Sequence, residues 1–228
     1  MNMQPKIDHV VRAATVADIP FLAKMDIEAS LPPLGVTFWD HHLENTGTDA
    51  LTFVEAMLRE EASNWGNVSD FIVMESEGIP VATCAVFRPE TLPEAGEGPL
   101  NLTKLDQVAD ALSWSETTTN AFLDAYQIVW GGDGNYMAPQ AELIIETVAV
   151  SPDHRGKGLG TALMHAAFAR GRELEAESIG IGVIHGNDGA QALYEKHFEP
   201  YATYWPASFD HKFPGITKYR ASLTEEMS

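Results

Sequence analysis

The sequence predicts an α/β protein with a sheet of about seven strands flanked by helices. Two observations carry this prediction: short stretches rich in β-branched residues recur along the whole chain, and stretches with apolar residues at helical spacing separate many of them. The predicted strands cover residues 9–13, 71–74, 80–87, 143–150, 178–184, 200–205 and 217–223. At 228 residues the chain favours one domain over two, and we expect a single domain over residues 1–228.

A helix start signal follows the first strand. Thr15 and Asp18 have capping-box spacing, and Ile19, Leu22 and Met25 continue at helical spacing, so the first helix is predicted here. It should end before the adjacent prolines at 32 and 33, because proline and the residue before it disfavour helix.

The next predicted elements are a loop, a second helix and a hairpin. Residues 31–42 are expected to form an irregular loop, and residues 49–64 have the apolar spacing of an amphipathic helix. The turn at Glu77-Gly78 should join the second and third strands.

Residues 89–140 are predicted as a helical insertion between the third and fourth strands. A linker rich in proline, glutamate and glycine opens the insertion, and apolar residues at helical spacing follow. Ser113 and Glu116 have the spacing of a capping box for its second helix, and Gly131-Gly132 should end that helix.

The stretch after the fourth strand carries the strongest functional signal. Gly156, Gly158 and Gly160 lie between a buried strand and a predicted helix, an arrangement that points backbone N–H groups at one place and favours an anion. The spacing is neither that of an NTP-binding loop, which needs Gly-Lys-Ser/Thr, nor that of a dinucleotide fingerprint. A glycine-rich turn without a ligand is the alternative.

Two motifs in this half of the chain resemble the GNAT superfamily of N-acetyltransferases. Arg155-Gly156-Lys157-Gly158-Leu159-Gly160 is similar to its acyl-CoA-binding signature R/Q-x-x-G-x-G/A. Further on, Asn187, Ala190, Leu193, Tyr194 and Lys196 match its pattern N-x-x-A-x-x-L-Y-x-K. One departure follows Lys196: the family usually has one further residue and then Gly-Phe, whereas here His197-Phe198 follows, as if the glycine were deleted. The resemblance implies the GNAT fold, a mixed and mainly antiparallel sheet that is parallel only at its central cleft.

The resemblance also implies the activity and the co-substrate. It implies direct transfer of an acetyl group from acetyl-CoA to the primary amine of a small molecule, with no acyl-enzyme and no metal. The implied acetyl-CoA contacts are Val148, Ala149, Val150, Arg155, Gly156, Lys157, Gly158, Leu159, Gly160, Thr161 and Asn187. A non-catalytic acyl-CoA sensor and a protein N-terminal or lysine acetyltransferase remain alternatives, and a helix N-cap explains Asn187 equally well.

Two residues are predicted to carry the chemistry. Tyr194 matches the family tyrosine that gives a proton to the departing sulfur. By strand alternation Glu146 shares a face with Val148 and Val150, and a partly buried carboxylate there could act as the general base. Glu142 and His185 are alternative bases.

Aromatic residues are the candidates for acceptor binding. In the family the segment between the first two helices commonly lines the acceptor site, which implies Phe38 and Trp39, although both could instead seal a core edge. Because the insertion enters the sheet beside the glycine-loop strand, we expect Trp114, Tyr126 or Trp130 to reach the acceptor. Packing on the domain or on a partner subunit is the alternative, which leaves a homodimer open.

Composition limits the class of protein. The formal net charge of −19 argues against a nucleic-acid partner. No apolar run is long enough for a membrane span, so we expect a cytoplasmic protein. The single Cys84 lies in an apolar strand and is expected to be a buried structural thiol, and the adjacent His41 and His42 lack the spacing of a metal site.

Overall fold

A computed structural model describes residues 9–89, 98–130, 138–205 and 214–224. Its strands are β1 (His9–Ala13), β2 (Phe71–Ser76), β3 (Ile79–Phe87), β4 (Leu143–Val150), β5 (Ser178–Ile184), β6 (Glu199–Tyr204) and β7 (Ile216–Ser222). Its helices are α1 (Ile19–Ser30), α2 (Phe38–Leu43), α3 (Ala50–Arg59), α4 (Leu105–Ala111), α5 (Glu116–Trp130), α6 (Leu159–Glu173) and α7 (Asp188–Tyr194). Among these helices, each is too short or too polar to traverse a lipid bilayer.

The seven strands form one sheet in the order β1-β2-β3-β4-β5-β7-β6. Every neighbouring pair is antiparallel except β4 and β5, which run parallel and are connected through α6. A parallel pair needs such a crossover, whereas the β2–β3 hairpin needs only the turn at Glu77-Gly78, where both residues have positive φ. The predicted fold class, including its helical insertion, is confirmed.

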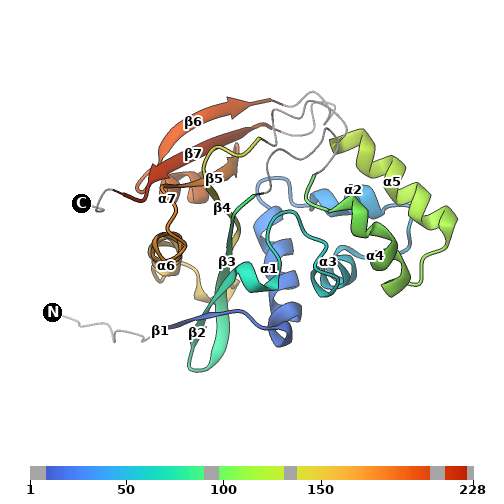
Figure 1. The fold of residues 1–228 in the computed structure, drawn as a ribbon, viewed down its shortest axis with the longest axis horizontal. Helices are drawn as coiled ribbons and strands as arrows, with labels where there is room; N and C mark the ends of the chain where they lie inside the picture. Colours follow the sequence, from blue (N-terminus) through green and yellow to red (C-terminus); the bar gives the residue numbers. More distant parts are fainter. Residues whose placement is uncertain (1–8, 90–97, 131–137, 206–213, 225–228) are drawn as a thin grey trace.

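Helices cover both faces of the sheet. Figure 1 shows α1 to α5 on one side and α6 with α7 on the other. Successive residues of β4 serve the two faces in turn, since Ile144 belongs to the core under α1 and α3 while Leu143 and Ile145 belong to the core under α6. Burial on both faces explains why β4 is a continuous apolar run in the sequence.

The insertion shares the core under α1 and α3. Phe122 and Tyr126 of α5 are fully buried, and the Phe122 ring lies 5.1 Å from that of Phe53 on α3. The Tyr126 hydroxyl accepts a hydrogen bond from the backbone N–H of Leu100 at 2.9 Å. The insertion is therefore part of the main core and not a separate unit packed on its surface.

Two local predictions were wrong. A short helix, α2, lies within the predicted loop, because Thr37 and Asp40 form a capping box in which each caps the other. The α5 helix begins at Glu116, and the Ser115 hydroxyl, not Ser113, accepts the Thr118 N–H at 3.2 Å. Part of the predicted linker (90–97) and the predicted stop at Gly131-Gly132 lie outside the described residues.

The central strand contains a bulge that changes which side chains share a face. The β3–β4 register shifts between Thr83 and Ala85, and Thr147 has a φ of 53°. Glu146 therefore pairs with Ala85 on the α1 side, whereas Val150 pairs with Ala82 on the α6 side. The expectation that Glu146 shares a face with Val150 was wrong, because one extra residue reverses the alternation.

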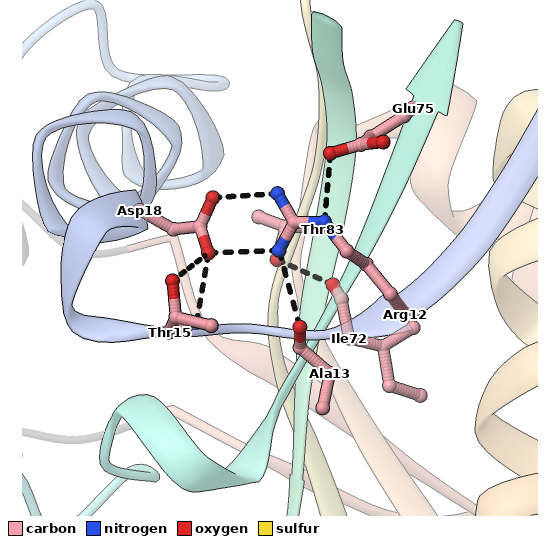
Figure 2. Close-up of polar contacts among 7 residues, drawn as sticks. All are labelled: Arg12, Ala13, Thr15, Asp18, Ile72, Glu75 and Thr83. Atoms are coloured by element: carbon pink, nitrogen blue, oxygen red, sulfur yellow. Dashed lines mark hydrogen bonds and ion pairs between the residues drawn. The ribbon is translucent and has the colours of Figure 1, made fainter. Parts of the chain in front are cut away.

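A cluster of charged groups ties the first strand to the first helix (Figure 2). The Arg12 guanidinium donates to both oxygens of Asp18, each at 2.8 Å, and its Nε donates to Glu75 Oε1 at 2.7 Å. The N–H and the hydroxyl of Thr15 also donate to Asp18. These bonds lower the pKa of Asp18 to about 2, and the bond with Arg12 has the largest effect. The cluster joins β1, β2 and the start of α1.

We predict that Asp18→Asn lowers the free energy of unfolding by about 1–3 kcal/mol at pH 7, because it removes a mostly buried carboxylate with strong donors. Because the pKa of Asp18 is lower in the folded than in the unfolded chain, this stabilisation is complete well above pH 4. It is lost as the pH falls from there towards 2. Urea denaturation at several pH values measures both effects.

The control for this prediction is Arg59→Ala, which breaks the exposed Arg59–Glu55 pair of α3 and should change the stability by less than about 0.5 kcal/mol. A loss of stability in Asp18→Asn that does not diminish at low pH would show that the carboxylate charge is not its cause.

Candidate functional site

A pocket of about 210 Å³ opens where β4 and β5 part. Pairing between these strands ends at Ile145 and Ile181, so the rest of each strand leaves backbone groups facing the gap. The pocket extends from α7 between the parted strands to α1, α2 and the insertion. Among the described residues that line it, four are ionisable: Asp26, Glu146, Tyr194 and Lys218.

Glu146 is the first β4 residue beyond the region paired with β5. It is half-buried in the pocket wall. Burial raises its pKa to about 7 against the opposing charge of Lys218, and the charge of Asp26 contributes to the rise. The carboxyl group can therefore exchange a proton near neutral pH, which is the property a general base requires.

Tyr194 is the last residue of α7, and its side chain reaches the same pocket. It is 5% exposed, and burial, followed by the charges of Glu146 and Cys84, raises the pKa of the phenol far above its ordinary value. The phenol is thus protonated at neutral pH, so in a proton transfer it would be the donor. Asn187 caps α7 by accepting from the Ala190 N–H at 3.3 Å, and it also lines the pocket.

Asp26 is a pocket carboxylate that the sequence analysis missed. Its oxygens accept hydrogen bonds from Trp39 Nε1 at 3.1 Å and from the Thr147 hydroxyl at 3.3 Å. Burial raises the pKa of Asp26 to about 6, and these two bonds oppose the rise. The sequence does contain a clue to this position: Asp26 lies four residues after the buried Leu22, which places it on the inner side of α1.

Lys218 of β7 was also missed. Its side chain is 8% exposed, and Nζ donates to the Ala138 carbonyl at 2.7 Å. Burial lowers the pKa of Lys218 to about 8, while Glu146 opposes that change. Alternation along β7 places it on the same face as Ile216, which also lines the pocket, and this was the available signal.

The glycine-rich loop joins β4 to α6. Gly156 and Gly158 have φ angles of 73° and 81°, which other residues adopt only with strain, and Gly158 is the N-cap of α6. A Cβ at Gly160 would lie 3.0 Å from Leu193, so a small residue lets α6 approach α7. Leu159 anchors the loop in the core, while Thr161 is exposed in the first turn of α6.

The basic residues of the loop already have partners. Arg155 forms an ion pair with Glu28 at 2.8 Å and donates to the Val150 carbonyl at 3.1 Å, which ties the loop to α1 and β4. Lys157 donates to the Asp153 carbonyl at 2.8 Å on the exposed surface. Of the β4 residues predicted to contact acetyl-CoA, Val148 lines the pocket and Ala149 is buried.

Both alternative bases lie outside the pocket lining. Glu142 is exposed, accepts the Glu177 N–H at 2.9 Å and pairs with Arg88 at 3.6 Å. His185 is bonded at both ring nitrogens, to the Pro214 carbonyl at 3.0 Å and to the Thr217 hydroxyl at 2.9 Å. Neither is positioned to act in the pocket.

The predicted aromatic residues separate into two groups. Phe38 and Trp130 line the pocket, together with Trp65, which the sequence analysis missed. Trp39 is 1% exposed, and its indole N–H donates a hydrogen bond to Asp26. The other two aromatic residues belong to the core: Trp114 donates to the Thr48 hydroxyl, and Tyr126 bonds to Leu100.

The remaining candidates have structural roles. Cys84 is fully buried, and burial raises the pKa of its thiol to about 12, as expected for a structural thiol. His42 is 1% exposed, and burial lowers its pKa to about 3, so its neutral ring accepts the Trp130 indole N–H at 2.9 Å. Within the described ranges, no three His, Cys, Asp or Glu residues are grouped as a metal site would require.

Comparison with known proteins finds similarity to acetyltransferases. Residues 113–199 match the model of the acetyltransferase (GNAT) family. An N-acetyltransferase from Staphylococcus aureus Mu50 is structurally similar, with a TM-score of 0.62, 17% identity, and coverage of 93% of this chain and 100% of the other. Curated protein sequences give no match.

Two further structures are similar at lower TM-scores. An agmatine N-acetyltransferase in its apo form has a TM-score of 0.51 and 15% identity, over 94% of this chain and 99% of the other. A ribosomal-protein-alanine N-acetyltransferase from Brucella melitensis has a TM-score of 0.50 and 17% identity, over 93% and 99%. The class of fold is thus that of N-acetyltransferases. The resemblance to the GNAT superfamily is confirmed.

We predict that the two charged neighbours of Glu146 shift its pKa in opposite directions. Asp26→Asn should lower the pKa of Glu146, because a negative neighbour is removed, and Lys218→Met should raise it, because a positive one is removed. Titration of the Glu146 carboxyl carbon by NMR measures both shifts. Asp106→Asn, an exposed change on α4, is the control, and shifts of the same sign in both variants would contradict the proposed electrostatics.

Proposed function

We propose that this protein transfers an acetyl group from acetyl-CoA directly to the primary amine of a small molecule. One observation carries the proposal: a carboxyl group with a pKa of about 7 and a phenol that stays protonated line one pocket where two parallel strands part. An acyl transfer to an amine needs a proton acceptor and a proton donor at the same reacting centre.

The residues between β4 and α6 fit acetyl-CoA. The β4 backbone beyond Ile145 lacks a strand partner on the β5 side, and Val148 lines the gap. The loop at Gly156 and Gly158 leads into the first turn of α6, whose N–H groups and dipole favour a pyrophosphate. When bound, acetyl-CoA supplies an activated acyl group as a thioester. The exposed Lys157 and Thr161 flank this turn and are proposed phosphate contacts.

The pocket residues divide the proton transfers between them. Glu146 accepts a proton from the acceptor ammonium, and the free amine then forms the C–N bond at the acyl carbon. As the C–S bond breaks, Tyr194 gives its proton to the departing sulfur. The new amide nitrogen releases its second proton to solvent, and solvent returns one proton to Tyr194. The low polarity around both residues makes these transfers sensitive to a single charge nearby, such as Asp26.

Aromatic side chains in the pocket support a small acceptor. Phe38, Trp65 and Trp130 line it from three different segments, and Trp130 comes from the insertion. A protein substrate would require an open groove, whereas these side chains build the walls of a small pocket. The structural neighbours include enzymes named for agmatine and for a ribosomal protein at similar TM-scores, so they favour neither acceptor class.

We predict that Gly158→Ala weakens acetyl-CoA binding by roughly 5- to 30-fold, because alanine at a φ of 81° costs about 1–2 kcal/mol and the loop must hold this conformation to bind. Calorimetric titration with acetyl-CoA measures the change. The matched control is Gly47→Ala, which has a φ of 72° and equally open space but lies in the α2–α3 connection. Equal affinity in the two variants would remove the loop from the binding site.

We predict that Tyr194→Phe and Glu146→Gln each lower kcat by about 10²-fold or more, with acetyl-CoA affinity unchanged. In the native protein the rate should rise with pH through the Glu146 pKa of about 7, because only the ionised carboxylate accepts a proton. That rise should disappear in Glu146→Gln. Steady-state kinetics by thiol release measures both; acetyl-CoA binding without turnover of any amine would favour the sensor alternative.

A further inference from the structure

A row of four residues crosses the sheet beneath the pocket. Ala85 on β3 pairs with Glu146, and Gly182 on β5 pairs with Lys218 on β7. Because Ile145 pairs with Ile181, Glu146 and Gly182 are the next two residues in register, at the point where the strands part. Glu146 and Lys218 therefore flank Gly182 on one face, with backbones more than two paired-strand spacings, or more than about 10 Å, apart.

Gly182 leaves the space between these two charges without a side chain. Ile216, which follows the same face of β7, borders this space and would meet a Cβ on Gly182 at 2.9 Å. Glu146, Gly182, Ile216 and Lys218 all line the pocket. The floor of the pocket thus has a carboxylate on one side, an ammonium on the other, and bare backbone between them.

The Lys218 ammonium has more donors than its surroundings use. It carries three N–H bonds, and in the described part of the chain it donates one hydrogen bond, to the Ala138 carbonyl at 2.7 Å. The Tyr204 ring lies 5.7 Å from Nζ and contributes a cation–π contact. Because burying a charge without partners is costly, two spare donors beside a pocket suit an anionic group of a ligand.

Three aromatic side chains, called here the aromatic wall, also line the pocket. The ring centroids of Phe38, Trp65 and Trp130 are 5.7–5.8 Å apart, with planes at 68–89° to one another. The bond from Trp130 to His42 fixes one of these rings. Such a wall favours an apolar or aromatic group on the ligand.

From this arrangement we infer that the acceptor is a zwitterion of the α-amino-acid class, whose carboxylate binds Lys218, whose ammonium faces Glu146, and whose apolar side chain lies on the aromatic wall. This inference rests on the proposed function and names its substrate class. A plain amine would leave the two remaining Lys218 donors without a ligand partner and place two cations on either side of Gly182, and a diamine would add a third. A protein N-terminus lacks the α-carboxylate. The products would be an N-acetylated amino acid and the CoA thiol, with the ammonium proton passed to Glu146.

Matched acceptor pairs test this inference. L-phenylalanine is compared with 2-phenylethylamine, and L-leucine with 3-methylbutylamine, so that each pair differs only in the carboxylate. In the native protein kcat/KM should be roughly tenfold or more higher for the amino acid, as expected for a charge-assisted hydrogen bond. Equal or higher values for the amines would overturn the inference and leave the proposed acetyl transfer intact.

Variants of Lys218 give the second test. Measured at a pH above the Glu146 pKa of each variant, Lys218→Met should raise KM for the amino acids by roughly tenfold or more relative to KM for the matched amines, whereas Lys218→Arg should retain part of the preference. Lys24→Met, on the exposed side of α1, is the control. An equal loss for both members of a pair would refute a carboxylate contact. If Lys218→Met does not fold, the comparison in the native protein decides.

The outcomes also separate this inference from the function on which it rests. Calorimetric binding of acetyl-CoA with no acetylation of either member of any pair overturns the inference alone. Failure to bind acetyl-CoA overturns the proposed function, and the inference with it.

Discussion

The parting of β4 and β5 is the constraint on which the rest of the structure depends. Parallel pairing lasts for only three positions, from Leu143 to Ile145, and then stops within a sheet that is otherwise continuous. Unpaired backbone groups inside a protein are costly unless they find another partner, so such a gap is unusual in a structure selected only for stability. The bulge at Thr147 curves β4 at the same point. Both features expose backbone where a ligand can bind to it.

The charged residues near the gap are likewise not the most stabilising choice for their positions. Asp26, Glu146 and Lys218 lie in surroundings that disfavour their charged forms, and each has its pKa moved towards neutrality by burial. Apolar side chains of similar volume would stabilise such positions more. By contrast, the Arg12 and Asp18 pair satisfies its hydrogen bonds fully and moves the pKa of Asp18 away from neutrality. Charged groups at the edge of the fold therefore stabilise it, while those in the pocket are held ready to exchange protons.

The insertion adds a side chain of its own to the pocket of a shared fold. Its helix α5 packs against α2, and Trp130 at the end of α5 reaches the pocket beside Phe38 of α2. The buried His42 links the two helices through the Trp130 indole. Substitutions in this part of the molecule would change the aromatic residues that line the pocket and leave the parted strands and the glycine loop in place.

The sequence by itself determined the strands, most helices, the glycine loop and the position of Tyr194 in its motif, because periodicity, turn residues and short motifs are local. It located Glu146 but not its face, since a bulge depends on the neighbouring strand. Asp26 and Lys218 carry no motif, and their roles arise because α1 and β7, nearly 200 residues apart in the sequence, meet at one gap. Only the tertiary structure decided which charges share the pocket, because burial and the distance between charges are properties of the folded chain.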